Sequence, residues 1–96
     1  LEFVEGDLDL FGSKIKSLGN LKSVGGYLDL GNSKIESLGR LQSVGSSLHL
    51  YDTNIKSFGN LKYVGDTLDL KNTHLSDEYS EEEINQMVDV GGEVIL

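Results

Sequence analysis

The sequence contains no cysteine, no proline and no tryptophan, and it has eight Lys and Arg residues against 16 Asp and Glu residues. Without cysteine, neither disulfides nor thiolate metal sites can support the fold. The absence of cysteine also fits a reducing compartment. No apolar run approaches the about 20 residues of a membrane span, and the N-terminal residues lack a signal-peptide pattern. We therefore expect no membrane partner.

The excess of acidic side chains lies at one end of the chain. Residues 1–76 hold nine acidic and eight basic side chains, whereas residues 77–96 hold seven acidic side chains and no basic one. A protein that binds a nucleic-acid backbone directly needs a basic surface. The charge pattern therefore argues against direct nucleic-acid binding.

Apolar residues return at a fixed interval of 20 residues. Such a period is typical of an architecture in which similar coils stack on one another. One coil alone cannot bury its leucines, but stacking buries them between neighbouring coils. The clearest columns are Leu8, Leu28, Leu48 and Leu68; Leu10, Leu30, Leu50 and Leu70; Ile15, Ile35, Ile55 and Leu75; and Val4, Val24, Val44 and Val64.

The pattern within one coil predicts its path. Leu28 and Leu30 flank Asp29, the alternation of a half-buried strand, and Leu21 with Val24 forms the return wall. A Ser or Thr follows each strand at 13, 33, 53 and 73, where a hydroxyl can bond to the backbone of a turn. Glycine precedes each strand, which suits a tight turn with positive φ. These glycines are Gly6, Gly25, Gly45, Gly65 and Gly91.

The run L-x-L-x-x-[ST]-x-I-x-S-[LF]-G-x-L-x-x-V-G resembles short leucine-rich repeats, especially the glycine-rich bacterial and phage variety. The resemblance covers residues 1–75 and part of 90–96, and it departs from the common pattern by Ser or Thr where Asn is usual. It implies a stacked solenoid of parallel strands that recognises proteins, located in the cytoplasm (that of the host, for a phage protein). The V-G-x-x-L-x-L phrase is also similar to receptor L-domain repeats, which implies a β-helix-like cross-section as an alternative.

The 20-residue period breaks after Leu75. Ser80 followed by Glu83 is a capping-box pattern, and Ile84, Met87 and Val88 give an apolar stripe at helical spacing, so we expect a helix over 80–88. The segment 90–96 then repeats the pattern of 24–30, which predicts a fifth strand. The predicted fold is a mostly β, α/β-repeat solenoid with a helix-containing cap. It forms one domain, 1–96, with four 20-residue coils in 1–76 and an acidic helix plus terminal strand in 77–96.

The first coil is expected to leave Leu8, Leu10 and Ile15 without a preceding coil to cover them. Either residues upstream of Leu1 or a second copy of the chain should therefore cover this end. Pairing of identical edge strands would bring Asp7 and Asp9 close to acidic counterparts. We therefore expect upstream sequence rather than a homo-oligomer here.

The outward positions of the strands form the first candidate binding site. Strands stack about 4.8 Å apart, so equivalent side chains of successive coils are direct neighbours. Aromatic anchors among carboxylates suit a protein-binding face, whereas the alternative interpretation is a solvated strand face with ordinary cross-strand packing. The candidate residues are Asp9, Phe11, Tyr27, Asp29, His49, Tyr51 and Asp69.

Metal binding and catalysis are both poorly supported. Asp29, His49 and Asp69 could hold a metal or act as an acid–base set, but a fourth ligand is missing and a flat face does not exclude water. The serines and glycines occupy repeat positions, so neither a nucleophile nor a phosphate loop stands out. We expect no enzyme activity, no metal and no cofactor.

Two functions remain open. The first is a protein–protein interaction module that uses the strand face. The second is a small acidic phage-type inhibitor whose cap blocks a nucleic-acid-binding protein such as a host-defence nuclease. The alternative interpretation of the glutamate run in the cap is that these residues form the ordinary first turn of a helix, with no binding role. The cap residues are Asp77, Glu78, Glu81, Glu82 and Glu83.

Overall fold

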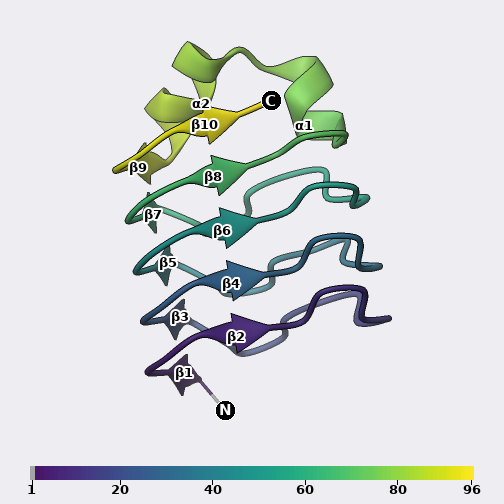
Figure 1. Cartoon of the computed structure of the whole chain (residues 1–96), viewed down its shortest axis with the longest axis vertical. Helices are drawn as coiled ribbons and strands as arrows, with labels where there is room; N and C mark the ends of the chain where they lie inside the picture. The colour runs from purple at the N-terminus through teal and green to yellow at the C-terminus, as the bar shows by residue number, and fades with distance from the viewer. Residues whose placement is uncertain (1) are drawn as a thin grey trace.

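The computed structural model describes residues 2–96, and within this range the strands form two five-stranded sheets that face each other (Figure 1). Each coil gives one short strand to each sheet. The front sheet contains β2 (Leu8–Asp9), β4 (Leu28–Asp29), β6 (Leu48–His49), β8 (Leu68–Asp69) and β10 (Val94–Ile95). The back sheet contains β1 (Phe3–Val4), β3 (Ser23–Val24), β5 (Ser43–Val44), β7 (Tyr63–Val64) and β9 (Asp89–Val90).

All strand pairs are parallel and in register with the sequence repeat. Leu28 pairs with Leu48, and Asp29 pairs with His49, so each column of the repeat is a column in space. The five predicted strands are confirmed as the front sheet, including β10, whose Val94 pairs with Leu68. The return segment of each coil, for which no strand was predicted, forms a second parallel sheet that includes Val24. The chain is therefore a β-solenoid in which each coil contributes one strand to each of two parallel sheets.

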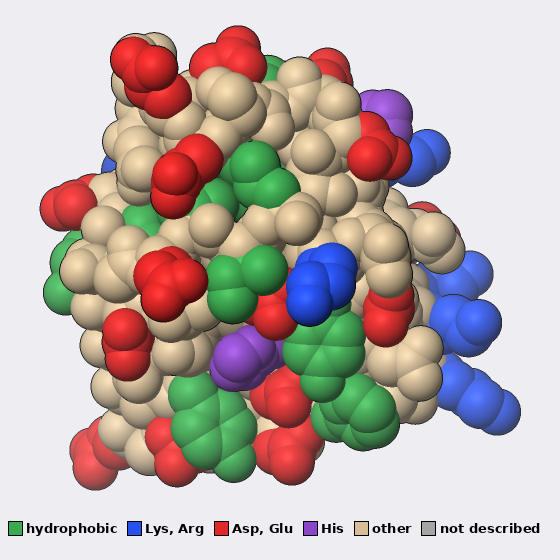
Figure 2. Space-filling view, turned by 45° about the horizontal axis from the view of Figure 1, so that its top comes forward, with side chains coloured by type: hydrophobic (Ala, Val, Ile, Leu, Met, Phe, Trp, Pro, Cys, Tyr) green, Lys and Arg blue, Asp and Glu red, His purple; other side chains and the backbone are tan. Residues whose placement is uncertain are grey.

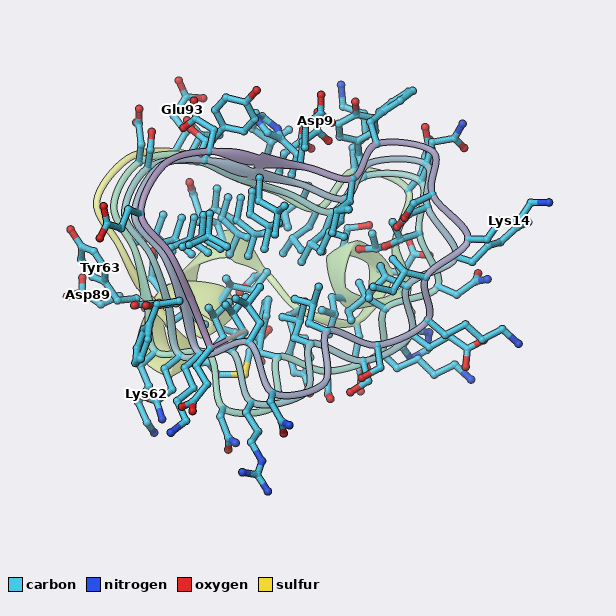
Figure 3. The ribbon with its side chains drawn as sticks, turned by 90° about the horizontal axis from the view of Figure 1, so that it is seen from below. Asp9, Lys14, Lys62, Tyr63, Asp89 and Glu93 are labelled. Carbon is cyan, nitrogen blue, oxygen red and sulfur yellow. The ribbon has the colours of Figure 1, made fainter. Side chains whose placement is uncertain are left out.

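The core lies between the two sheets. Viewed along the solenoid axis, the inward side chains of both sheets fill the space enclosed by the coils (Figure 3). Leu28, Leu30 and Leu48 from the front sheet are fully buried, as is Val44 from the back sheet. Removing such side chains from water is the main favourable contribution to folding, at roughly 25 cal/mol per Å² of apolar surface.

The turn after each front strand has a repeated chemistry. Its second residue adopts positive φ even where it is not glycine, as at Asn32 and Asp52, because a short polar side chain tolerates this conformation. The next residue is the predicted hydroxyl. Thr53 Oγ1 donates to the carbonyl of Leu50 at 2.7 Å, which confirms the backbone-bonding role at this position.

The predicted reason for the glycines before each front strand was wrong. Positive φ occurs at Gly12, Gly19, Gly39 and Gly59 rather than at these positions. Gly45 is needed because a Cβ there would overlap the carbonyl oxygen of Gly25 in the coil before it. Close approach between neighbouring coils, and not backbone conformation, selects glycine at 25, 45, 65 and 91, whereas Gly6 lies one position later in the repeat and has no such contact.

The C-terminal cap contains two helices, α1 (His74–Glu78) and α2 (Glu81–Met87). The capping box of Ser80 and Glu83 is confirmed, with Ser80 Oγ accepting from the N–H of Glu83 at 3.2 Å. Helix α1 was not predicted, and it begins before the expected cap boundary at 77. The predicted apolar stripe of α2 is partly wrong, since Ile84 and Val88 are buried but Met87 is exposed.

The N-terminal end of the stack is covered less than the rest. Leu8 and Leu10 are only partly buried and Ile15 is 36% exposed, whereas their counterparts one coil later are fully buried. This confirms that no preceding coil within residues 2–96 covers the first one. Within residues 2–96, neither helix is long and apolar enough to cross a membrane.

Candidate binding site on the front sheet

The outer face of the front sheet gathers aromatic and acidic side chains, as the sequence predicted. The ring of Tyr51 lies between two other rings, with its centroid 6.3 Å from that of Phe11 and 6.1 Å from that of His49. The Phe11 ring is tilted by 47°, and the His49 ring meets Tyr51 edge-on at 75°. Figure 2 shows this face, with hydrophobic side chains beside a histidine, acidic groups around them and a basic side chain next to them. We call the set Asp9, Phe11, Tyr27, Asp29, His49, Tyr51 and Asp69 the aromatic–acidic patch.

The ring of Tyr51 packs over Gly31, a residue to which the sequence analysis assigned no role. The equivalents of Tyr51 in the same column are Phe11, Gly31 and Lys71, so Gly31 lacks the side chain that its neighbours carry. A Cβ at Gly31 would lie 2.7 Å from Cε1 and from Cε2 of Tyr51. The ring of Tyr51 therefore lies flat over the backbone of the neighbouring coil.

The aspartates of the patch also have a structural role. Asp9 Oδ1 accepts from the N–H of Phe11 at 3.0 Å, and Asp29 Oδ1 accepts from that of Gly31 at 2.9 Å. Asp69 Oδ1 accepts from the N–H of Lys71 at 3.1 Å. Such bonds from a side chain to the backbone two residues on explain why aspartate recurs at the ends of β2, β4 and β8. One oxygen of each carboxylate is thereby used inside the fold.

His49 and Ile95 depart from this aspartate column. His49 Nδ1 lies 3.9 Å from Asp69 Oδ2, which is too long for a hydrogen bond and gives at most a weak ion pair when the imidazole is protonated. Across residues 2–96, no group of three or more His, Cys, Asp or Glu side chains is arranged to hold a metal ion.

The electrostatic potential at Tyr51 is negative, because four carboxylates act on it. Desolvation raises the pKa of the Tyr51 phenol above its ordinary value of 10.0, and the charges of Asp29, Asp69, Asp52 and Asp9 raise it further. A cation placed over this ring would meet both the electron-rich aromatic face and these carboxylates.

Tyr27 lies on the same face but outside the ring contacts of Tyr51. It occupies the column of Asp7, and its backbone N–H donates to Asp7 Oδ1 at 2.9 Å. Its side chain is 37% exposed. The structure thus brings Phe11, His49 and Tyr51 together and leaves Tyr27 as a separate exposed aromatic, in the column next to that of His49.

The acidic cap, Asp77, Glu78, Glu81, Glu82 and Glu83, is spread over both helices. Two of its members have local partners: Glu83 Oε1 accepts from the N–H of Ser80 at 3.0 Å, and Glu78 Oε2 lies 3.1 Å from His74 Nε2. Glu81 and Glu82 are exposed in the first turn of α2. Basic side chains project from another side of the solenoid, where Lys14 extends into solvent (Figure 3).

A hollow of about 910 Å³ lies away from the patch, between the side turns of two coils and α1, and it is partly open to solvent. Its lining carries charges of both signs, including Glu36, Lys56 and Asp77. The patch itself lies on a flat sheet face. Small-molecule sites are concave and mostly apolar, so the patch suits a macromolecular partner better.

Comparisons with protein-family models, with curated proteins and with solved structures found no match. The fold and the patch together define the class of the molecule as a two-sheet β-solenoid with an exposed aromatic–acidic face.

Proposed function

We propose that the chain is a non-enzymatic protein-recognition module that binds a basic segment of a partner protein through the aromatic–acidic patch. The observation that carries the proposal is the position of Tyr51, held flat over Gly31 between Phe11 and His49. A tyrosine ring supplies a large, rigid contact area at low conformational-entropy cost, because its side chain has only two rotatable angles. Tyrosine is also enriched among residues that dominate binding energy.

The composition of the patch favours a cationic partner. Arginine and lysine side chains bind over aromatic faces, with a gain of roughly 0.5–2 kcal/mol, more when the site is desolvated. Within residues 2–96 the second oxygens of Asp9 and Asp29 make no hydrogen bond, whereas that of Asp69 lies 3.9 Å from His49 Nδ1. An extended segment with Lys or Arg would therefore find both aromatic and carboxylate contacts on one flat surface.

The proposal is tested by selecting binders from a random peptide library on the immobilised protein. We expect the selected peptides to be rich in Lys and Arg and to shift the NMR resonances of Phe11, His49 and Tyr51. Binding should be lost in the Tyr27→Ala/Tyr51→Ala variant. Tyr63→Ala is the matched control, because Tyr63 is a tyrosine on the back sheet with a similar exposed fraction, 43%. Peptides that bind the double variant as well as the unchanged protein would contradict the proposal.

The second candidate function is that of an acidic inhibitor. It is favoured by the seven carboxylates and absence of basic residues in 77–96, and it would place the acidic cap in the basic channel of a nucleic-acid-binding protein, for example a host-defence nuclease. In that case Glu81→Lys/Glu82→Lys, and not the tyrosine pair, would abolish binding, and affinity would fall steeply with salt. Binding that survives both pairs of changes would contradict both functions.

A further inference from the structure

One position before each front strand is glycine in every coil that has a coil beneath it. At these glycines the backbone N–H donates to a valine carbonyl of the preceding coil, as from Gly45 to Val24 at 2.8 Å and from Gly65 to Val44 at 2.9 Å. These bonds draw the two turns so close that a Cβ would overlap a carbonyl oxygen of the preceding coil. This holds at Gly25, Gly45, Gly65 and Gly91, whose Cβ atoms would overlap the carbonyl oxygens of Glu5, Gly25, Gly45 and Gly65 respectively.

Glu5 is the exception in this column of residues 2–96, and it lies in the first coil. Its turn lies between β1 and β2, which pair in register with β3 and β4, so it follows the same path as the later turns. A further coil beneath it would place a carbonyl oxygen where the Cβ of Glu5 stands. The end of a side chain can swing away, but a Cβ is fixed by the backbone.

We infer that Glu5 closes the N-terminal end of the stack to any further coil of this backbone path, whether that coil belongs to the same chain or to a second copy. The block depends only on the Cβ at position 5, so it does not rest on the proposed binding function. A segment that covers Leu8, Leu10 and Ile15 must therefore do so without pairing beneath the turn at Glu5.

A block at Glu5 would limit association through the open edges of the two sheets at the N-terminal end. Parallel strands with an unpaired edge are templates for further strands, and partly exposed apolar side chains add to the attraction. The next residue, Gly6, does not provide such a block, because glycine has no Cβ. One Cβ in the column where coils approach most closely stops the repeat while leaving the hydrogen bonds of the first coil to the second intact.

The experiment adds one coil, a copy of residues 21–40, directly before residue 1 of the full chain. Three extended proteins are compared: Glu5 unchanged, Glu5→Gly and Glu5→Ala. Glu5→Ala is the matched control, because it removes the charge but keeps the Cβ. The readout is hydrogen exchange at the amide of residue 5, which would donate to the added coil only if that coil stacks.

We expect exchange at residue 5 to slow by about tenfold or more in the extended Glu5→Gly protein only, because a hydrogen-bonded amide exchanges when the structure opens. The m-value for urea unfolding should rise in that protein alone, since more surface is then buried. Protection with Glu5 or with Ala in place would overturn the inference. Lack of protection in all three proteins would overturn it too, because something other than the Cβ would then close the end.

Discussion

The ring of Tyr51 occupies the space that a side chain on Gly31 would need. Cε1 and Cε2 of Tyr51 would each lie 2.7 Å from a Cβ built at Gly31, which is well inside van der Waals contact. Tyr51 follows β6 and Gly31 follows β4, so the ring crosses from one coil to the coil before it. The room left by Gly31 in one coil thus lets the half-buried ring of Tyr51 in the next coil lie against the sheet.

Gly31→Ala should therefore displace the ring of Tyr51 without unfolding the protein. The ring is at the surface and can swing outward, so we expect a loss of less than about 1 kcal/mol in the free energy of unfolding, as for most surface substitutions. Nuclear Overhauser contacts between the rings of Tyr51 and Phe11 should weaken or vanish. Tyr51→Phe is the control, because it removes the hydroxyl and keeps the ring in place. Unchanged ring contacts in Gly31→Ala would show that Gly31 does not set the position of Tyr51.

Gly45→Ala should be far more costly than Gly6→Ala. At Gly45 the added methyl meets the backbone oxygen of Gly25, so the two coils must separate, with a loss of roughly 1–3 kcal/mol or more. At Gly6 the methyl meets nothing within 4 Å among the described residues, and alanine reduces the entropy of the unfolded chain. Urea unfolding of the two variants measures the difference. Equal stabilities would refute the close-approach explanation for this glycine column.

Leu48→Ala should lower the free energy of unfolding by about 2–5 kcal/mol, because Leu48 is fully buried in a middle coil and the change leaves a cavity. Leu8→Ala is the matched control at the same repeat position. Leu8 is only partly buried, so its truncation should cost less than half as much. A loss at Leu48 no larger than that at Leu8 would mean that the middle coil is packed no better than the end.

Ser80→Ala should cost about 1 kcal/mol, because the hydroxyl accepts the N–H of Glu83 at the start of α2. Asn85→Ala lies in the same helix on an exposed position and should be neutral or slightly stabilising, since alanine has the higher helix propensity. Thermal unfolding followed by circular dichroism compares the two. A Ser80→Ala protein as stable as the parent would mean that the cap helix does not depend on this N-cap.

The front sheet could be predicted because its signals are local and repeated. Leu28, Asp29 and Leu30 alternate within one strand, and the same pattern returns at each coil, so period and strand reinforce each other. Helix α1 could not be predicted in this way. Thr73 matches the hydroxyl column and Leu75 matches the isoleucine column, so both fit a further coil. In the structure the Thr73 hydroxyl keeps the bond of its column, to the carbonyl of Leu70 at 2.7 Å, and Thr73 is in addition an N-cap that is reciprocally bonded to Ser76.

The candidate site was predictable in its residues but not in its geometry. Alternation places Phe11, His49 and Tyr51 on one face, which the structure confirms. The dependence of Tyr51 on Gly31 involves contact across coils, and the role of Asp29 in binding the N–H of Gly31 involves a turn conformation. For the contact between Tyr51 and Gly31, the available signal in the sequence was a glycine in a column of larger side chains.

The charges around Tyr51 lead to a prediction about pH. Desolvation and the carboxylates of Asp29 and Asp69 raise the pKa of its phenol above the ordinary 10.0, so the folded protein holds this proton at a pH where the unfolded chain has lost it. The contribution to stability is therefore complete below pH 10 and declines as the pH rises from there through the folded-state pKa. Asp29→Asn/Asp69→Asn should bring the pKa of Tyr51 down, because the amide oxygens can still accept the N–H bonds of Gly31 and Lys71 while the charges are gone. Asp77→Asn, in the cap, should leave it unchanged. NMR titration of ¹³C-labelled tyrosine follows the ring directly, and a Tyr51 pKa that does not fall in the double variant would mean that these carboxylates do not act on the ring.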